Sequence, residues 1–201
     1  MVSEEEVIKQ FKNLKDNKAT TYKNIPGKIL KENADVYYST VTNIVNSEFE
    51  NDSYPNSLKL ADVTPGFKSG DRTNGEDYRP VSVIAYASKI FERIMQAQLL
   101  DKINPHLSEN LCGYREGYST QHALISMVEK WRKSLDNKGF AGAVLMDLSK
   151  AFDCMNHGLL LAKLYAYGLS KKALKLVHNY LNNRWQRVKV HQTFSPWEEL
   201  L

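Results

Sequence analysis

Asp147 is the residue whose type and position could best support chemistry in this 201-residue chain. It follows the apolar run FAGAVLM at residues 140–146, which comes after the turn signal NKG at 137–139 and has the length of a buried strand. A carboxylate at the exit of a buried strand can bind a hard cation such as Mg²⁺ through oxygen, as phosphoryl-transfer enzymes require. The alternative is an aspartate that simply caps a turn, which is common at such positions.

A basic segment is the second feature with chemical potential. Between Cys154 and Trp197 there is no aspartate or glutamate, although the net charge of the whole chain is only +4. The positive side chains of this segment are Lys163, Lys171, Lys172, Lys175, Arg184, Arg187 and Lys189. An acid-free basic segment with interleaved aromatic residues suits a phosphate backbone. The alternative is an ordinary solvated basic face.

Cysteine usage and the N-terminus exclude several classes of protein. Cys112 and Cys154 lie far apart without a CxxC motif, so we expect reduced thiols instead of a disulfide or a zinc site. Ser3 and Glu6 have the spacing of a helix capping box, which does not resemble a secretory leader. No apolar run reaches the length of a membrane span. We therefore expect an intracellular domain without a membrane partner.

Hydrophobic periodicity predicts an α+β fold. Helices are expected near residues 4–15, 35–49, 88–103, 119–135, 157–167 and 171–182, and strands at 58–64, 140–146 and 185–191, the last as the first arm of a hairpin. The helix at 119–135 is expected to bury Leu124, Met127, Val128 and Trp131. Gly168 and a Ser170 N-cap are expected to separate the last two helices.

Residues 147–169, DLSKAFDCMNHGLLLAKLYAYGL, closely resemble the central palm motif of reverse transcriptases from non-LTR, LINE-type retrotransposons. Four further blocks follow the order of that family. They are a fingers motif at 67–83, a helix at 88–95, a glycine-rich arginine segment at 113–120 and a segment leading to a hairpin at 180–190. Together the five blocks cover about residues 60–200.

The resemblance implies a right-hand polymerase architecture in which helices pack on a small, incomplete antiparallel sheet. Residues 1–57 would form an N-terminal helical extension of the fingers, residues 58–139 the fingers, and residues 140–201 part of the palm. The implied partners are an RNA template, a DNA primer and a deoxynucleoside triphosphate. A retroelement ribonucleoprotein in the nucleus or cytoplasm is the implied setting, and oligomeric state stays open.

The resemblance also assigns roles to individual residues. Asp147 matches the position that binds both catalytic Mg²⁺ ions, with the Leu148 carbonyl as a further oxygen ligand. Phe152 falls at the position where an aromatic ring excludes ribonucleotides, the alternative being a core phenylalanine. Lys68 and Arg79 match residues that bind the incoming triphosphate. The alternative for both is a surface ion pair with a nearby carboxylate.

Template contacts are implied for Arg115 and for the basic segment. Arg115 lies between Gly113 and Gly117, and a flexible surface loop explains it nearly as well. The residues of the basic segment implied to contact nucleic acid are Lys171, Lys172, Lys175, Arg184, Arg187 and Lys189.

The chain contains no Asp-Asp pair, although the family draws further metal ligands from such a pair. Asp153 is the only nearby carboxylate, and the family does not use it as a second ligand. We therefore expect a fragment of an RNA-directed DNA polymerase with little or no synthesis of its own. Two alternatives stay open: a non-catalytic module that binds RNA or a template-primer, and a non-functional remnant that exposes a strand edge and aggregates.

Overall fold

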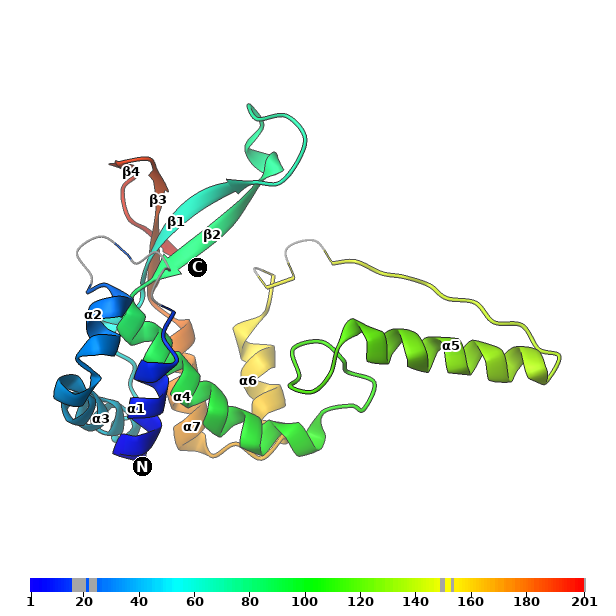
Figure 1. Ribbon diagram of the computed structural model, residues 1–201, viewed down its shortest axis with the longest axis horizontal. Coiled ribbons are helices and arrows are strands. Elements are labelled where there is room, and N and C mark those ends of the chain that lie inside the picture. The colour runs from blue at the N-terminus through cyan, green and yellow to red at the C-terminus, as the bar shows by residue number, and fades with distance from the viewer. Residues whose placement is uncertain (16–20, 22–24, 149–150, 153, 201) are drawn as a thin grey trace. The chain divides into compact units, whose positions relative to one another are not determined.

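The computed structural model describes residues 1–15, 21, 25–148, 151–152 and 154–200 (Figure 1). The chain divides into two compact units. Unit 1 comprises Met1–Lys102 and His157–Leu201, and unit 2 comprises Ile103–Asn156. The boundaries of these units differ from the predicted boundaries at residues 57 and 139. The division into an N-terminal extension, fingers and part of a palm therefore stays a prediction. No helix among the described residues is long and apolar enough to span a bilayer.

Unit 1 contains most of the helices. They are α1 (Glu4–Lys12), α2 (Gly27–Glu32), α3 (Ala34–Glu50), α4 (Tyr86–Ile103, whose last residue belongs to unit 2), α6 (His157–Ala166) and α7 (Lys171–Leu181). Two of the predicted caps are confirmed. Ser3 and Glu6 form a reciprocal capping box at the start of α1, and the Ser170 hydroxyl accepts a hydrogen bond from the Ala173 N–H at the start of α7. Gly168 adopts a positive φ of 88° before α7, as its predicted role as a helix stop requires.

The sheet of unit 1 is mixed. Its strands are β1 (Leu60–Phe67), β2 (Tyr78–Ile84), β3 (Arg184–Val190), β4 (Thr193–Phe194) and β5 (Glu198–Leu200). β1 and β2 form an antiparallel hairpin, and β4 and β5 both pair antiparallel with β3. However, β1 and β3 run parallel, with Asp62 opposite Arg187. The α+β class is confirmed, and the expectation of an antiparallel sheet was wrong for this pair, because the long connection between β1 and β3 lets the chain return to the same end of the sheet before β3 begins.

Short 3-10 turns complete the connections of the chain. They are η1 (Asn56–Leu58), η2 (Gly75–Asp77) and η3 (Asn104–His106). The turn η1 leads directly into β1, and η2 lies at the tip of the β1–β2 hairpin. These turns shorten the loops that hold the strand ends in place.

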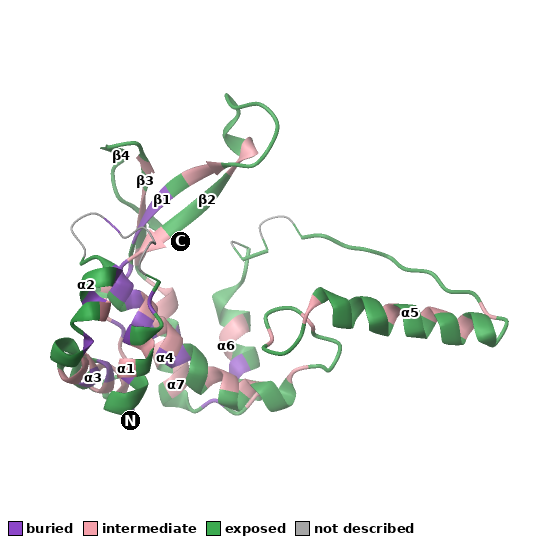
Figure 2. Cartoon of the chain, in the orientation of Figure 1, coloured by how far each residue is buried: buried purple, intermediate pink, exposed green. Residues whose placement is uncertain are grey.

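The core of unit 1 lies among its helices (Figure 2). Val7, Phe11 and Leu14 are buried as the helical periodicity predicts. Three edge-to-face ring contacts then link α3, α4 and α7: Phe49 meets Phe91 at 5.4 Å, Phe91 meets Tyr54 at 5.1 Å, and Tyr54 meets Tyr180 at 5.0 Å. Such aromatic pairs add to the free energy gained by burying their area. Ile90, Phe91 and Ile94 of α4 are buried as well.

Gly27 marks a close approach between α2 and α4. A Cβ atom added at Gly27 would lie 2.5 Å from the ring of Tyr86, the buried first residue of α4. The hydroxyl of Tyr86 donates a hydrogen bond to the carbonyl of Lys15 beyond α1. Glycine is therefore needed here to let the helix backbone reach this ring.

Unit 2 has no buried residue among those described. Its helix α5 (Thr120–Asp136) matches the predicted helix, and Ser119 and His122 form the cap at its start. The predicted burial is wrong, because Leu124 is 55% exposed and Val128 52% exposed, while Met127 and Trp131 are half-buried. Periodicity predicts which face of a helix is apolar, but burial also requires a second surface, and the described part of unit 2 does not provide one.

Residues 140–148 are extended without strand pairing, so the predicted strand at 140–146 was wrong. Leu145 is 91% exposed. A strand is defined by hydrogen bonds to a neighbouring strand, and none is present in the described part of unit 2. The apolar run is therefore available for pairing without being paired in this structure.

Candidate functional site

The β1–β2 hairpin positions Lys68 and Arg79. The hairpin register places Gly66 opposite Arg79 and Phe67 opposite Tyr78. The pairing continues one residue further, because the Lys68 N–H donates to the Asp77 carbonyl at 2.8 Å. Side chains alternate between the faces of a strand, so Lys68 and Arg79 share one face as diagonal neighbours, roughly 7–8 Å apart in Cα position.

Both cationic side chains on this face are exposed to solvent. The alternative of an ion pair with Asp71, Glu76 or Asp77 is not present, since neither Lys68 nor Arg79 forms an ion pair within the described residues. Two cations on one face of a rigid hairpin can contact adjacent phosphates of one ligand. The hairpin therefore brings together Lys68 and Arg79, two of the three residues that were predicted to contact the nucleotide.

The carboxylates at the hairpin tip serve the turn. Asp71 accepts hydrogen bonds from the backbone N–H and the hydroxyl of Thr73, both at 2.8 Å. The backbone hydrogen bond is the largest cause of the lowered pKa of Asp71. Asp77 accepts from the Asp71 N–H at 2.8 Å. These acids hold the backbone of the tip, which leaves the neighbouring cations accessible.

Asp147, Leu148 and Phe152 lie in unit 2, and all three are exposed. Phe152 is 71% exposed and meets the edge of Tyr114, with ring centroids 6.0 Å apart, so the alternative of a core phenylalanine is wrong. Asp153 lies outside the described residues. These residues belong to a different unit from the hairpin, and their predicted roles stay predictions.

Asp147 has too few companions to form a complete metal site. Among the described residues, no three histidine, cysteine, aspartate or glutamate side chains converge so that they could hold a metal ion. A two-ion site needs several carboxylates around two cations about 3.5–4 Å apart. The described residues therefore contain no complete site for two metal ions.

Three lysines of the basic segment are exposed on α7. Lys171 and Lys172 are exposed in the first turn of α7. Lys175 is also exposed, and its ammonium lies 3.6 Å from the carboxylate of Asp52. The lysine end of this pair is exposed, whereas the Asp52 side chain is only 13% exposed, so a phosphate that displaced Asp52 would leave a mostly buried carboxylate without its cation.

Arg184 belongs to a half-buried polar cluster. Its guanidinium donates to the Tyr180 carbonyl at 3.0 Å and lies 4.0 Å from Glu92 on α4. Glu92 also accepts hydrogen bonds from the hydroxyls of Tyr180 at 3.0 Å and Ser88 at 3.3 Å. Arg184 therefore links β3 to α4 and α7, and a structural contribution accompanies its predicted contact with nucleic acid.

Burial dominates the ionisation of this cluster. It raises the pKa of Glu92, although the Tyr180 hydroxyl and Arg184 oppose the rise. Burial and the nearby Glu92 carboxylate raise the pKa of Tyr180 to about 12. Burial followed by repulsion from Arg184 lowers the pKa of Lys59, whose ammonium donates to Asn179 at 3.2 Å. The cluster was not predicted, because Glu92 and Tyr180 are 88 residues apart in sequence.

Arg187 is held between β1 and two aromatic rings. Its Nε donates to the buried carboxylate of Asp62 at 2.7 Å. Its guanidinium lies 3.9 Å from the ring centre of Phe194 and 4.5 Å from that of Trp197. Lys189 lies 5.6 Å from the same Phe194 ring. Arg187 is therefore a packing residue first, and Asp62, within an apolar strand, was the sequence signal for such a partner.

Arg115 is half-buried in unit 2. Its guanidinium donates to the Ser108 carbonyl at 3.1 Å and lies 4.4 Å from the centre of the Tyr118 ring. These contacts order the segment at 113–120 around the arginine. They leave its predicted contact with a template as a prediction.

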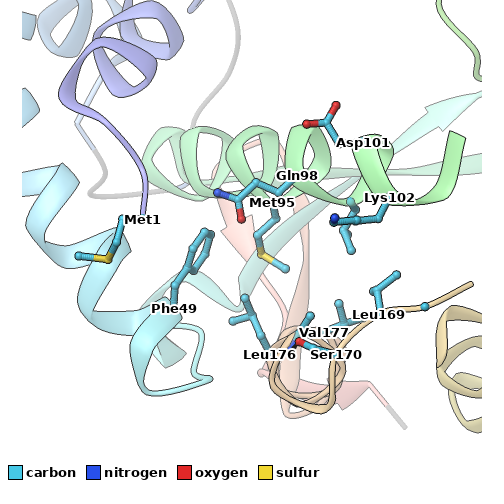
Figure 3. Close-up of a pocket in the computed structure, with 13 residues that line it drawn as sticks. Met1, Phe49, Met95, Gln98, Asp101, Lys102, Leu169, Ser170, Leu176 and Val177 are labelled. Atoms are coloured by element: carbon cyan, nitrogen blue, oxygen red, sulfur yellow. Dashed lines mark hydrogen bonds between the residues drawn. The ribbon is translucent and has the colours of Figure 1, made fainter.

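A cavity of about 590 Å³ lies within unit 1, between α3, α4 and α7 (Figure 3). Phe49, Met95 and Val177 form part of its apolar lining, and Lys102 and Ser170 add polar groups. It contains none of the predicted site residues. The cavity is therefore separate from the cationic face of the hairpin.

A paired hairpin with two exposed cations is followed along the chain by an aspartate segment and a basic helix. The chain belongs to the family described as reverse transcriptase (RNA-dependent DNA polymerase), whose model matches residues 68–199. This match includes every predicted site residue. The predicted membership is therefore confirmed.

Similar proteins come from fruit-fly transposable elements. A probable RNA-directed DNA polymerase from transposon BS of Drosophila melanogaster is 27% identical over 204 residues, which cover 95% of this chain and 21% of that protein. The corresponding protein of transposon X-element is 27% identical over 172 residues, which cover 84% of this chain and 18% of that protein. The RNA-directed DNA polymerase from mobile element jockey is 28% identical over 123 residues, which cover 60% of this chain and 13% of that protein. The resemblance to non-LTR retrotransposons is confirmed, and this chain spans about a fifth of the length of the first two relatives.

Proposed function

We propose that this chain supplies the fingers and the first part of the palm of an RNA-directed DNA polymerase. The shared exposed face of Lys68 and Arg79 carries the proposal, since it lies within the segment that matches the family. A guanidinium can contact two phosphate oxygens at once, and an ammonium adds a mobile point charge. Their ligand in this proposal is the triphosphate of an incoming deoxynucleotide.

Asp147 is proposed as one carboxylate ligand of the family's Mg²⁺ ions, with the Leu148 carbonyl as a neighbouring oxygen. Phe152 is proposed to pack beneath the sugar of the incoming nucleotide, where its ring would crowd a 2′-hydroxyl. The described residues contain no group of side chains that completes a metal site. We therefore expect little or no DNA synthesis by the 201-residue chain alone.

The basic residues are proposed to bind an RNA template and a DNA primer. Lys171, Lys172 and Lys175 would contact phosphates directly, because their ammonium groups are exposed on α7. The other members of the set have packing partners and would contribute charge from more fixed positions: Arg184, Arg187, Lys189 and Arg115. A retroelement ribonucleoprotein, in the nucleus or the cytoplasm, is the proposed setting.

A non-catalytic binding module is the second candidate. The observation that favours it is the combination of exposed lysines on α7 with an isolated, exposed Asp147. Phosphate-backbone affinity depends on cations and needs no metal site. The two candidates differ in what Asp147 contributes, so one substitution separates them.

The test combines template-primer binding with primer extension. The wild-type chain, Asp147→Ala and the control Asp136→Ala are compared on an RNA template annealed to a DNA primer, with Mg²⁺ and deoxynucleotides. Asp136 is an exposed aspartate that pairs with Arg132, so its loss controls for a change of one charge. We expect all three proteins to bind within about twofold of one another, because a lone exposed carboxylate adds little to phosphate affinity.

Extension decides between the candidates. Binding without extension by any of the three proteins is the expected result. Extension that is lost only in Asp147→Ala would establish catalysis by this chain and would overturn the expectation of an incomplete site. Failure of the wild-type chain to bind the template-primer would contradict both candidates.

A further inference from the structure

The β1–β2 hairpin has a second face with its own chemistry. Phe67 and Tyr78 lie directly opposite each other in the register, one residue away from the cations Lys68 and Arg79. Because successive side chains point to opposite faces, these rings lie on the face opposite the two cations. The proposed nucleotide contacts therefore leave the aromatic face unused.

An arginine completes the aromatic face. The Arg72 guanidinium lies 4.8 Å from the ring centre of Phe67, and the Phe67 and Tyr78 rings meet edge to face at 5.5 Å and 65°. The Tyr78 hydroxyl donates to the Arg72 carbonyl at 2.9 Å. The tip residue Arg72 is thus fixed to the same face through its backbone and its side chain.

The turn that carries Arg72 is well ordered by hydrogen bonds. Asp71 and Asp77 accept from backbone N–H groups of the turn, as described above. Gly70 adopts a φ of 98°, and a Cβ atom there would lie 2.6 Å from the Asp77 carboxyl group. Only glycine suits this position. The aromatic face is therefore presented on a preorganised tip, which lowers the entropy cost of binding.

Packing does not account for this face. Phe67 is 40% exposed, and the hairpin tip extends away from the buried helices of unit 1 (Figure 2). A rigid, half-exposed phenylalanine beside an exposed guanidinium matches the chemistry of an unpaired nucleotide, whose base can stack on the ring and whose phosphate can accept from the arginine.

We propose that Phe67, Tyr78 and Arg72 form a subsite for single-stranded RNA on the face of the hairpin opposite Lys68 and Arg79. The inference rests on the proposed function in placing RNA beside this domain. The tip carries as many acidic as basic side chains between residues 67 and 79, namely Asp71, Glu76 and Asp77 against Lys68, Arg72 and Arg79. Because these charges balance, we expect stacking on an unpaired base to contribute more to the affinity of this subsite than electrostatic attraction to a phosphate backbone does.

The experiment measures two ligands on one set of variants of the full chain. Fluorescence anisotropy reports the binding of a labelled six-nucleotide single-stranded RNA, and a competition assay with a labelled nucleotide reports the binding of dTTP. Phe67→Leu keeps apolar volume but removes the aromatic face, and we expect RNA affinity to fall about five- to tenfold. Arg72→Ala should weaken RNA binding in the same direction. Neither change should alter dTTP binding by more than about twofold, since both residues lie on the opposite face.

Val81→Ala is the matched control, because Val81 is an exposed apolar residue of the same hairpin on the face of Arg79. It should leave RNA binding unchanged. Tyr78→Phe keeps the ring and removes the hydroxyl bond to Arg72, so it should retain most of the affinity. Thermal melts of all variants report whether the hairpin still forms.

Arg79→Ala separates failure of this inference from failure of the proposed function. Loss of dTTP binding with unchanged RNA binding is expected and supports two separate faces. Normal dTTP binding in Arg79→Ala, combined with weak RNA binding in Phe67→Leu, would contradict the nucleotide role and uphold the RNA subsite. RNA affinity that is unchanged in Phe67→Leu, equal losses in Phe67→Leu and Val81→Ala, or no RNA binding by the wild type would overturn the subsite.

Discussion

Units 1 and 2 use similar sequence patterns with opposite results. In unit 1 the apolar stripe of α1 is fully covered, and Phe11 has no exposed surface. In unit 2 the apolar stripe of α5 remains open, with Leu124 and Val128 more than half exposed. Both helices have a capping box and clear periodicity. The difference teaches that local signals determine a helix, whereas burial depends on a partner surface supplied from elsewhere.

The same contrast separates the candidate functional residues. Lys68 and Arg79 are brought together by strand pairing in unit 1. Asp147 and Phe152 lie on an unpaired segment of unit 2 and are exposed. A geometric argument is therefore strong for the proposed nucleotide contacts of the hairpin, while the roles of the aspartate segment rest on the family match.

Hydrogen exchange offers the largest expected difference between the units. Amides of α4 are expected to exchange only through extensive unfolding, because Ile90, Phe91 and Ile94 are buried. Amides of α5 should exchange several orders of magnitude faster, because a 17-residue helix without a covered face is marginal in water. Deuterium uptake followed by mass spectrometry measures both. Equal protection of α5 and α4 would show that the apolar stripe of α5 is covered in solution, and would break the comparison.

Truncation of one apolar side chain in each unit is the next largest test. Phe11→Ala should lower the free energy of unfolding by about 3–5 kcal/mol, because it leaves a cavity in the core of unit 1. Leu124→Ala should change it by no more than about 0.5 kcal/mol, because most of the side chain is already in water. Urea unfolding followed by circular dichroism gives both values. A loss above about 2 kcal/mol in Leu124→Ala would reveal packing that this structure lacks.

Helix positions were largely predictable from the sequence, because the signals are local. The cap at Ser3, the stop at Gly168 and the stripe of α1 each involve residues within a few positions of one another. Strand β3 was predicted as the first arm of a hairpin for the same reason, and a short loop joins it to β4. Within such ranges the pattern of residues determines the structure almost alone.

Long-range pairing could not be predicted in the same way. The parallel pairing of β1 with β3 joins residues 125 positions apart, and it brings Asp62 to Arg187. The predicted strand at 140–146 was wrong for a related reason, because a strand forms only where a neighbouring strand pairs with it. At the candidate site, the cations of the hairpin were predicted by resemblance. Arg72 was not predicted, because its position over the ring of Phe67 is known only from the structure.

The smallest expected effect concerns the pH dependence of the polar cluster in unit 1. Burial raises the pKa of Glu92 in the folded protein above its ordinary value of 4.5. A raised folded-state pKa means that the contribution of Glu92 to stability is fully present below pH 4.5 and is lost as the pH rises through the folded-state value. Glu92→Gln carries a neutral side chain of similar shape, so it should lack this part of the pH dependence.

Urea unfolding at several values between pH 4 and 8 tests the sign of this effect. The stability of wild type relative to Glu92→Gln should decrease as the pH rises. Tyr180→Phe should enlarge the decrease, because the Tyr180 hydroxyl opposes the raised pKa of Glu92 by donating to its carboxylate. Tyr180 itself does not ionise in this range, since its pKa lies at about 12. A wild-type advantage that grows with pH would contradict this prediction. It would mean that Arg184 and the hydroxyls stabilise the charged Glu92 carboxylate more than burial destabilises it.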